Sequence, residues 1–444
     1  MPTNTFLKGY MLLIKNGTLI TPEKVVKADI LVEKGRIEKI KKEIKRKKGV
    51  RVIDASGRIV MPGLICAHHH LYSTFARGMI LKTKPPRNFS EILENLWWKL
   101  DKALEPGDLY YSSVPVLIDA VKHGITTIID HHESQDYQIG SLDEIAESFR
   151  DVGIRGCLCF GASDRYGKGK EGLKENERFL SQLSTFNSQF LLKGLVGLHA
   201  SFTVNDETLR GAVEIAKKFK TGIHIHCAED ISDQKITEKK YGMRVIERLY
   251  KAGALGRKTI AVHCIHLNDR EINLLKKTDT IVVHNPESNM NNSVGWANVL
   301  KMMKKKILVG LGTDGMSSNI FREMRVAYLI SHHEISDPGV GFVEAVKMLI
   351  FNNPVIAERV FGTKIGILKE GTIADIVIFD YFPPTPLNSS NIFGHLLFGL
   401  VDARVLTVIC NGKLIFNKGK ILTIDEEKIV EVARKKAFKL WNKI

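Results

Sequence analysis

Eight short apolar runs, rich in β-branched residues, recur along the middle of the chain and are separated by stretches of helical periodicity. The runs are residues 59–66, 125–131, 154–160, 195–199, 222–227, 259–264, 280–285 and 307–313. The helical stretches between them include residues 108–122, 141–151, 206–220, 241–252 and 268–276. A strand followed by a helix, repeated eight times, is typical of a parallel barrel. We therefore predict an α/β fold whose main part is a (β/α)8 TIM barrel.

The two ends of the chain have a different pattern. Residues 11–54 and 374–424 alternate apolar and polar positions between glycine-containing turns, which is typical of β-hairpins. We expect the hairpins of both ends to pair in one small β-sandwich. The predicted domain limits are 1–60 and 367–424 for the two parts of the sandwich, 61–366 for the barrel and 425–444 for a terminal helix. A chain of 444 residues has room for these two domains.

The composition excludes several classes of protein. Hydrophobic residues make up 44% and charged residues 26%, as in ordinary globular enzymes and unlike disordered or fibrous chains. No apolar run approaches the ~20 residues of a membrane helix, and residues 1–17 lack the pattern of a secretory signal. The six cysteines lie mostly inside apolar runs, as expected of reduced core thiols. We expect a cytoplasmic protein without a membrane partner.

The net charge of +16, from 65 basic and 49 acidic side chains, raises the question of a nucleic-acid partner. The charge is spread along the chain, however, and the only dense basic run is residues 41–48. No basic helix with interleaved aromatic residues accompanies this run. A solvated basic surface explains the pattern better, and we expect no nucleic-acid partner.

The strongest local signal is a row of three histidines, residues 68–70, at the end of the first barrel run. Positions two apart share one face of a strand, so His68 and His70 can hold one metal ion while His69 points away. Two structural histidines would give the same pattern. The place of the motif at the end of a barrel strand favours the metal, because barrel enzymes carry their chemistry there.

Two further blocks end barrel runs with possible ligands. His226 closes the fifth run, and Glu229 follows three residues later, where a carboxylate can move the proton of an activated water molecule. Asp314 follows the eighth run, and a buried aspartate is costly unless it is paired or bound to metal. Any single block could be structural. Three blocks at barrel strand ends predict a metal-dependent active site.

Other residues can line the pocket above these groups. His263 ends the sixth run and could contact the attacking water or the substrate, and His199 and His131 end two other runs. A packed core histidine is the alternative for each, and a structural tryptophan is the alternative for Trp97. Arg77 and Arg165 are candidates to hold an acidic substituent. The aromatic and amide residues available to a planar heterocycle are Tyr72, Phe75, Trp97, Trp98, Phe202, Asn289, Asn291, Asn292 and Trp296.

These blocks together resemble the amidohydrolase superfamily, in the branch of cytosine deaminase, the triazine hydrolases and S-adenosylhomocysteine deaminase. The resemblance rests on PGLICAHHH, HASFT, HIHCAED, VHCIHL, VHNPESNMNNSVG and GLGTDG, and it covers nearly the whole chain. NLWWKLDKAL, IDHHES and PTPLNSSNIFGH are similar to the SsnA-like aminohydrolases in particular. Two departures concern the shape of the pocket: Cys66 stands where the family usually has Asn or Asp, and the segment after His199 lacks the usual proline.

The resemblance implies one divalent metal ion, Zn²⁺ or Fe²⁺. Its ligands would be His68, His70, His226 and Asp314. Glu229 would be the proton shuttle, His263 the partner of the water or of the leaving group, and Asp314 also the acceptor of the water's proton. Members with two metal ions carry a lysine at the end of the fourth strand. That strand ends here in His199, with Lys193 at its other end, which favours a single metal ion.

The activity that the resemblance implies is hydrolytic deamination of a heterocyclic amine, either nucleobase-, nucleoside- or pterin-like, with release of ammonia. Trp97, His199, His131 and Asn289 would contact the substrate. A chlorohydrolase or a cyclic-amide hydrolase could use the same metal-activated water. An inactive scaffold of the same fold is a further alternative, but such proteins tend to lose ligands, and all four are present. We expect a homo-oligomer, a dimer or larger.

Overall fold

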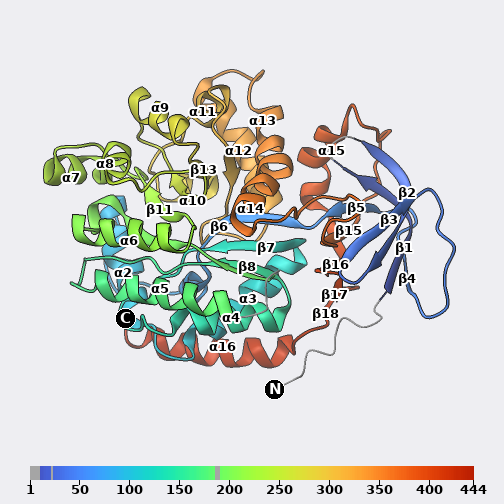
Figure 1. The fold of residues 1–444 in the computed structure, drawn as a ribbon, viewed down its shortest axis with the longest axis horizontal. Coiled ribbons are helices and arrows are strands. Elements are labelled where there is room, and N and C mark those ends of the chain that lie inside the picture. Colours follow the sequence, from blue (N-terminus) through green and yellow to red (C-terminus); the bar gives the residue numbers. More distant parts are fainter. Residues whose placement is uncertain (1–10, 22–23, 186–190) are drawn as a thin grey trace.

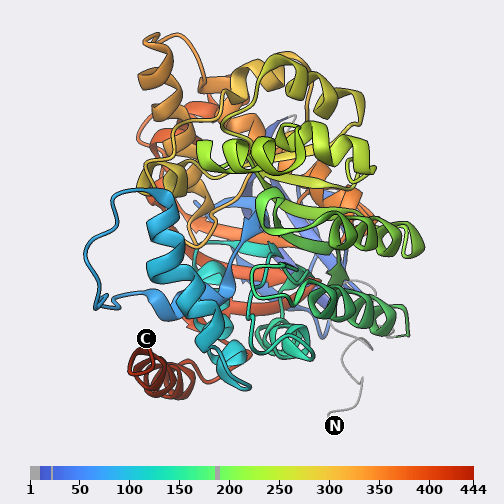
Figure 2. The same cartoon turned by 90° about the vertical axis from the view of Figure 1, so that its left-hand side faces the viewer.

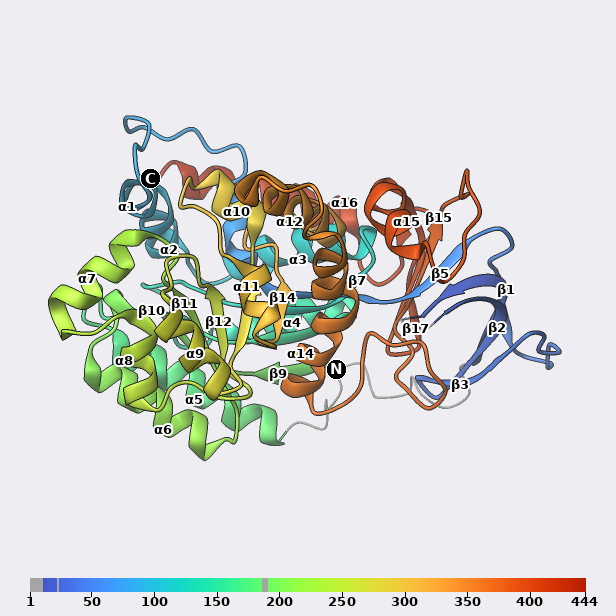
Figure 3. The same ribbon diagram turned by 90° about the horizontal axis from the view of Figure 1, so that it is seen from above.

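The computed structural model describes residues 11–21, 24–185 and 191–444, and it has a mixed α/β fold. Parallel strands surrounded by helices form one part, and a sheet built from both ends of the chain lies beside them (Figure 1). Seen from above, this terminal sheet lies to one side of the parallel strands (Figure 3). The expectation that residues 1–17 form no secretory signal includes residues 1–10, which lie outside the described part of the chain.

The parallel strands form two sheets. The first contains β6 (Leu64–His69), β7 (Ile125–Asp130), β8 (Arg155–Leu158) and β9 (Leu192–Gly194). The second contains β10 (Val196–Ala200), β11 (Ile223–Cys227), β12 (Ile260–His263), β13 (Ile281–His284) and β14 (Val309–Leu311). Only Leu195 separates β9 from β10, so the chain passes from the first sheet to the second at the start of the fourth apolar run. Every predicted run contains a strand, and the predicted parallel order is confirmed.

Single parallel bridges connect the two sheets. His69 pairs with Asp314 beyond the end of β14, and Ala162 pairs with Leu198 of β10. The amide of His70 also donates to the carbonyl of Asp314 at 2.8 Å. The ladders nevertheless form two sheets and not one continuous ring, so the closed barrel is confirmed only in its strand order.

Helices follow most of the parallel strands. The larger ones are α3 (Asp108–Lys122), α4 (Ser141–Val152), α5 (Gly169–Thr185), α6 (Asp206–Lys218), α7 (Ile231–Tyr241), α8 (Val245–Ala252), α9 (Asp269–Lys277), α12 (Ile320–Ile335) and α14 (Asn353–Phe361). The side chains of Asn205 and Asn268 accept hydrogen bonds from the first turns of α6 and α9, which fixes where these helices begin. Gly153 ends α4 with a φ of +84°.

Shorter helices cover the open end of the parallel strands and the junction with the terminal sheet. They are η1 (Leu71–Ala76), α1 (Phe89–Ile92), η2 (Leu93–Trp97), α2 (Trp98–Ala103), η3 (Ser201–Thr203), α10 (Pro286–Asn291), α11 (Val299–Lys304), α13 (Phe342–Lys347), η4 (Met348–Asn352), α15 (Ile392–Phe398) and η5 (Leu400–Asp402). The segment from η1 to α2, light blue in Figure 2, stands out from the body of the molecule.

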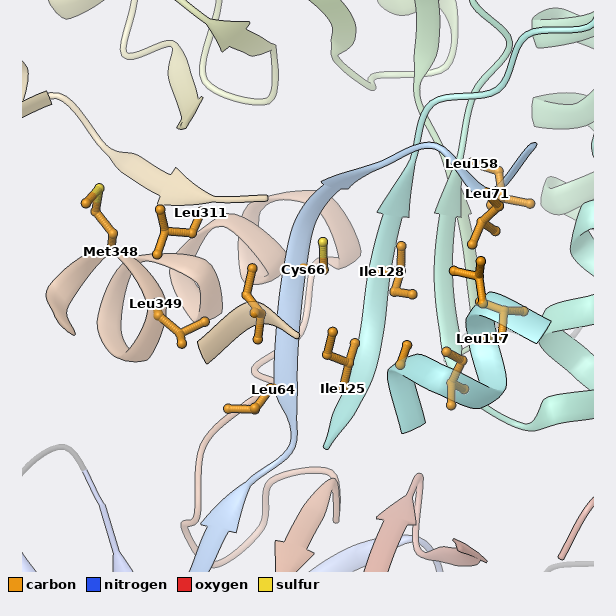
Figure 4. Packing of buried hydrophobic residues seen from close by; sticks show 14 of the residues in the cluster. Leu64, Cys66, Leu71, Leu117, Ile125, Ile128, Leu158, Leu311, Met348 and Leu349 are labelled. Carbon is orange, nitrogen blue, oxygen red and sulfur yellow. The ribbon is translucent and has the colours of Figure 1, made fainter. Parts of the chain in front are cut away.

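The main core lies between the strands and these helices. Leu64 and Cys66 of β6 and Ile125 and Ile128 of β7 pack toward Leu117 of α3 and their neighbours (Figure 4). All six cysteines are free and buried, as the sequence indicates. Within the described residues, no helix combines the length and the apolar character that crossing a membrane requires.

The terminal sheet has nine strands. They are β1 (Met11–Ile20), β2 (Val25–Glu33), β3 (Arg36–Lys41), β4 (Arg51–Asp54), β5 (Ile59–Pro62), β15 (Ile376–Asp380), β16 (Arg404–Cys410), β17 (Lys413–Asn417) and β18 (Lys420–Ile421). Strand β5 pairs with β1 on one side and with β15 on the other, which joins the two chain ends. This pairing is confirmed. The ladders connect all nine strands into one sheet, so the two layers of a sandwich are not confirmed.

The predicted C-terminal helix is α16 (Glu426–Trp441), and it packs against the parallel-strand part rather than the terminal sheet. It runs beside α3 (Figure 1). Lys436 Nζ lies 2.9 Å from Asp108 Oδ1 at the start of α3. The indole of Trp441 donates to the carbonyl oxygen of Phe75 at 2.6 Å, so the chain end reaches the segment that follows β6.

Candidate metal centre and active site

The carboxyl ends of β6, β11 and β14 bring the four predicted ligands together. The Oδ1 atom of Asp314 lies 3.1 Å from Nε2 of His68 and 3.0 Å from Nε2 of His70. Nε2 of His70 lies 3.1 Å from Nε2 of His226. Residues 246 positions apart thus meet at one point, because parallel strands end at the same edge of their sheets.

The hydrogen bonds of His70 and His226 show that this point calls for a positive charge. Nδ1 of His70 lies 2.5 Å from the carbonyl oxygen of His131, and Nδ1 of His226 lies 2.7 Å from that of His199. Since a carbonyl can only accept, each ring carries its hydrogen on Nδ1 and turns a lone pair at Nε2 toward the other. Burial opposes the charged form of His70, but the carboxylate of Asp314 raises the pKa of this ring. The raised pKa is a second sign that a positive charge is favoured at this point. Three nitrogen donors and one carboxylate are a suitable set for Zn²⁺ or Fe²⁺.

A second histidine on β11 orients His68. Nδ1 of His68 lies 2.9 Å from Nε2 of His224, and Nδ1 of His224 lies 3.6 Å from Sγ of Cys159. A proton on Nδ1 of both rings satisfies this chain and leaves the Nε2 lone pair of His68 directed at Asp314. The sequence analysis gave His224 no role, although its alternation with His226 places both side chains on the same face of the strand.

Glu229 and His263 lie beside the ligand cluster. Oε2 of Glu229 is 3.5 Å from Nε2 of His263, and the Asn292 amide donates to Oε1 of Glu229 at 3.4 Å. Burial and the negative charge of Asp314 raise the pKa of Glu229 well above its ordinary value. A raised pKa favours the protonated form of Glu229, which suits a group that donates a proton to a ligand.

The backbone is strained where these groups emerge. Four non-glycine residues next to the strand ends have positive φ angles: Ala228 (48°), His263 (67°), Cys264 (56°) and Asp314 (54°). Such angles cost energy and are kept where the fold holds a side chain in a required place. Gly161 allows another close approach, because a Cβ there would lie 2.5 Å from the ring of His131 and 2.9 Å from Cγ of Glu133.

A pocket of about 810 Å³ opens over the cluster, between the strand ends and the helices α1, η2 and α2. Of the predicted site residues, it is lined by His70, Trp97, His199, His226, Glu229, His263 and Asp314. Tyr72, Trp98, Phe202 and Asn292, from the predicted aromatic and amide set, line it too.

Comparison with known proteins agrees with this geometry. The model that describes the amidohydrolase family matches residues 59–415. The chain belongs to the amidohydrolase family. The 5-methylthioadenosine/S-adenosylhomocysteine deaminase of Pyrococcus furiosus is 31% identical in an alignment of 430 positions that covers 95% of this chain and 98% of that protein. The 5′-deoxyadenosine deaminase of Methanococcus aeolicus is 32% identical in an alignment of 447 positions, gaps included, that covers 97% of this chain and 99% of that protein.

The fold has solved counterparts as well. A crystal structure of an adenosine deaminase from Xanthomonas campestris with bound zinc superposes with a TM-score of 0.83 at 22% identity, covering 97% of this chain and 98% of that one. The predicted resemblance to amidohydrolases is thus confirmed. The narrower resemblance to the SsnA-like group stays a prediction.

Two predicted substrate contacts lie behind the pocket wall of this amidohydrolase. His131 is fully buried, packs its ring 4.6 Å from that of His226 and directs Nε2 to the carbonyl oxygen of Leu198. Asn289 contacts Nδ1 of His263 at 2.8 Å through its amide nitrogen. Neither residue is part of the lining. Both support site histidines instead of facing the pocket.

Neither of the arginines predicted to hold an acidic substituent lines the pocket. Arg77 is exposed on the loop after η1. Arg165 is buried and paired with Asp101 and Glu133, two residues without a predicted role. Glu133 follows β7 in the segment IDHHES, so its place after a strand end could have marked it. Nothing in the sequence around Asp101 distinguishes it from a surface residue of a helix.

Proposed function

We propose that this amidohydrolase deaminates an adenosine-like heterocyclic amine by hydrolysis and releases ammonia. The convergence of His68, His70, His226 and Asp314 beside Glu229, at the floor of a pocket, carries the proposal. The relatives described above are named as deaminases of adenosine analogues, which supports an adenosine-like ring as the substrate.

We assign the metal site to these four residues, with one Zn²⁺ or Fe²⁺ ion. When bound, the ion activates a water molecule for attack. The facing lone pairs of His70 and His226 support an ion at this point. His199 at the end of the fourth strand supports a single ion, because no lysine is available there to bridge two.

The side chains divide the proton transfers between them. Asp314 accepts a proton from the attacking water, and Ser288, whose hydroxyl donates to Oδ2 of Asp314 at 2.5 Å, keeps that carboxylate in place. Glu229 protonates the ring nitrogen, which makes the ring carbon more electrophilic. Asp314 then passes its proton to the amino group, which leaves as ammonia, and Glu229 regains its proton from the new hydroxyl group. His263 lies beside Glu229 and stabilises the charge that develops in this step. Trp97 and His199, on the pocket wall, hold the ring.

The architecture and setting belong to the same proposal. The limits 1–60, 61–366, 367–424 and 425–444 divide the chain into sandwich, closed (β/α)8 barrel, sandwich and helix. The bridge between His69 and Asp314 and the superposition at a TM-score of 0.83 support closure of the barrel.

The six free buried cysteines support a cytoplasmic location. Leu329, Val343 and Phe398, which are exposed apolar side chains on the contacting helices α12, α13 and α15, support a homo-oligomer.

The decisive experiment measures ammonia release by the metal-loaded protein from adenosine, 5′-deoxyadenosine, guanine and an aminopterin. We expect ammonia from the adenosine-like compounds. No ammonia from any of them, with chloride release from a chlorinated heterocycle, would replace deamination by dehalogenation. Elemental analysis should find one metal ion per chain. Chelation should lower the melting temperature, because binding to the folded state stabilises it.

A further inference from the structure

One wall of the pocket consists of a buried ion cluster, the acidic wall, formed by Asp101, Glu133 and Arg165. Nη2 of Arg165 lies 2.8 Å from Oδ2 of Asp101 and 2.5 Å from Oε2 of Glu133. The three side chains are only 1%, 3% and 6% exposed. They come from α2, from the loop after β7 and from the loop after β8, so three separate segments of the chain build this wall.

The acidic wall adjoins the reaction centre. Oε1 of Glu133 lies 3.6 Å from Nε2 of His199, and ligand atoms of Glu133, His199 and His226 lie within 4.8 Å of one another. A substrate held between His199 and the metal ligands therefore meets Glu133. On its other side the cluster is closed by Trp98, whose ring centroid is 4.8 Å from Cζ of Arg165.

The wall presents carboxylates to the pocket and keeps its cation behind them. Asp101 and Glu133 line the pocket, whereas Arg165 is not part of the lining. Oδ1 of Asp101 is buried and has no hydrogen-bond partner among the described residues. An unpaired buried acceptor costs free energy that a donor on a ligand would recover. Burial raises the pKa of Asp101 and of Glu133. Whether or not one of them takes up a proton, no uncompensated positive charge faces the ligand.

We propose that the acidic wall selects the substrate by charge. It accepts a substrate part that donates hydrogen bonds, such as hydroxyl or ammonium groups, and it rejects a carboxylate or phosphate group. This inference rests on the proposed deamination of an adenosine-like compound and adds which substituents such a compound can carry. It also reverses the sequence expectation for Arg165, because this side chain is paired with two carboxylates and does not line the pocket, so it cannot present its charge to an acidic group there.

Three ligands that differ at one position test the proposal: adenosine, 5′-amino-5′-deoxyadenosine and adenosine-5′-carboxylic acid. Turnover is measured as ammonia release and binding by calorimetry, both with the metal-loaded full chain. We expect the carboxylate to bind about 100-fold more weakly than adenosine, since placing like charges together in a buried site is strongly unfavourable. The amine should bind at least as tightly as adenosine.

Two substitutions assign the selectivity to the wall. Glu133→Gln removes one carboxylate and leaves Arg165 with one partner, so the preference for adenosine over the carboxylate should fall about 10-fold or more. Asp136→Asn is the matched control: it removes a charge from the same loop, but Asp136 is exposed and pairs with Lys168 at the surface. The control should keep the preference of the unmodified protein.

The two measurements separate this inference from the proposed function. Deamination of adenosine with equal binding of the carboxylate would overturn the acidic wall and leave the proposed function in place. Absence of ammonia with the expected binding order would overturn deamination and keep the wall. Absence of binding by all three ligands would overturn both. If Glu133→Gln does not fold, the comparison of the three ligands on the unmodified protein still decides the question.

Discussion

Buried charges are treated differently in the terminal sheet and at the ends of the parallel strands. In the terminal sheet, Asp29 accepts hydrogen bonds from the amides of Asn16 and Ile44 at 2.8 Å and pairs with Lys15 at 3.0 Å. At the junction of the two regions, Asp375 accepts from the amide of Asn411 at 2.7 Å and forms a buried ion pair with Arg155. Each carboxylate oxygen there has a partner.

At the strand ends, by contrast, buried polar atoms lack partners among the described residues. They include Oδ1 of Asp101, Oδ2 of Asp130, Nδ1 of His131, both ring nitrogens of His284 and Oδ1 of Asn289. Buried polar groups are normally satisfied, and the exceptions cluster where ligands or ordered water complete the structure. Asp29 and Asp375 are thus satisfied by groups of the chain, whereas several buried atoms at the strand ends are not satisfied by the described residues. Four substitutions test this contrast.

The largest effect should come from His226→Ala, which removes a ligand at the point where two ring lone pairs face each other. We expect loss of bound metal and of ammonia release together, down to background. Elemental analysis and a coupled ammonia assay measure the two. Metal-free forms of the variant and of the unmodified protein should melt within a few degrees of each other. A variant that keeps its metal would contradict the ligand assignment.

Glu229→Gln should separate metal binding from turnover. The amide keeps the shape of the side chain but cannot pass a proton, so we expect one metal ion per chain and a fall in kcat of about 10²- to 10⁴-fold. Steady-state kinetics with adenosine measure the fall. Wild-type rates in this variant would show that another group moves the proton.

The same contrast explains what the sequence could predict. The four proposed ligands could be predicted to lie close together because each follows an apolar run, and parallel strands must end at a common edge. The acidic wall was not found, because its pairs join residues 64 and 32 positions apart in loops and a helix without periodic pattern. His131 and Asn289 also follow strands, but beyond a strand end the alternation of faces no longer fixes where a side chain points. They support the pocket from behind.

Fold predictions divide along similar lines. The order of the strands could be predicted from the sequence. The pairing of the two chain ends could be predicted too, because β5 leads directly from the terminal sheet into β6. The number of layers in the terminal sheet depends on how β15 and β16 continue from β5, a long-range register that local alternation does not contain. The gap in the parallel ladders at Leu195 concerns a single residue, and it leaves no sign in the apolar pattern of the sequence.

Asp375→Asn should lower stability without changing catalysis. It leaves the guanidinium of Arg155 buried without its ion-pair partner, which typically costs about 3–5 kcal/mol. Urea unfolding measures the loss, and kcat for adenosine should stay unchanged. Asp279→Asn removes the pairs of the half-exposed Asp279 with Arg257 and Arg359 and should cost less than Asp375→Asn, because solvent screens a charge at this position. A fall in kcat for Asp375→Asn would mean that the two regions are coupled.

Among the four test substitutions, apart from the surface control, the smallest effect, and the one that depends on pH, should come from Asp29→Asn. Burial opposes the charge of Asp29, but hydrogen bonds from the amides of Asn16 and Ile44, together with Lys15, lower its pKa below the ordinary value of 3.8. A carboxyl group with a lowered folded pKa stabilises the protein above its unfolded pKa and loses that contribution as the pH falls through the folded value. The variant should be less stable by about 2 kcal/mol near neutral pH.

The difference between Asp29→Asn and the unmodified protein should therefore shrink as the pH falls below 3.8, because protonation then removes the same charge from the unmodified chain. Urea unfolding at a series of pH values measures it, and ammonia release at neutral pH should equal that of the unmodified protein. A stability gap of constant size across the acid range would assign the loss to the shape of the side chain instead of its charge. Reduced turnover would show that Asp29 in the terminal sheet affects the active site at the strand ends, and it would contradict the contrast between the two regions.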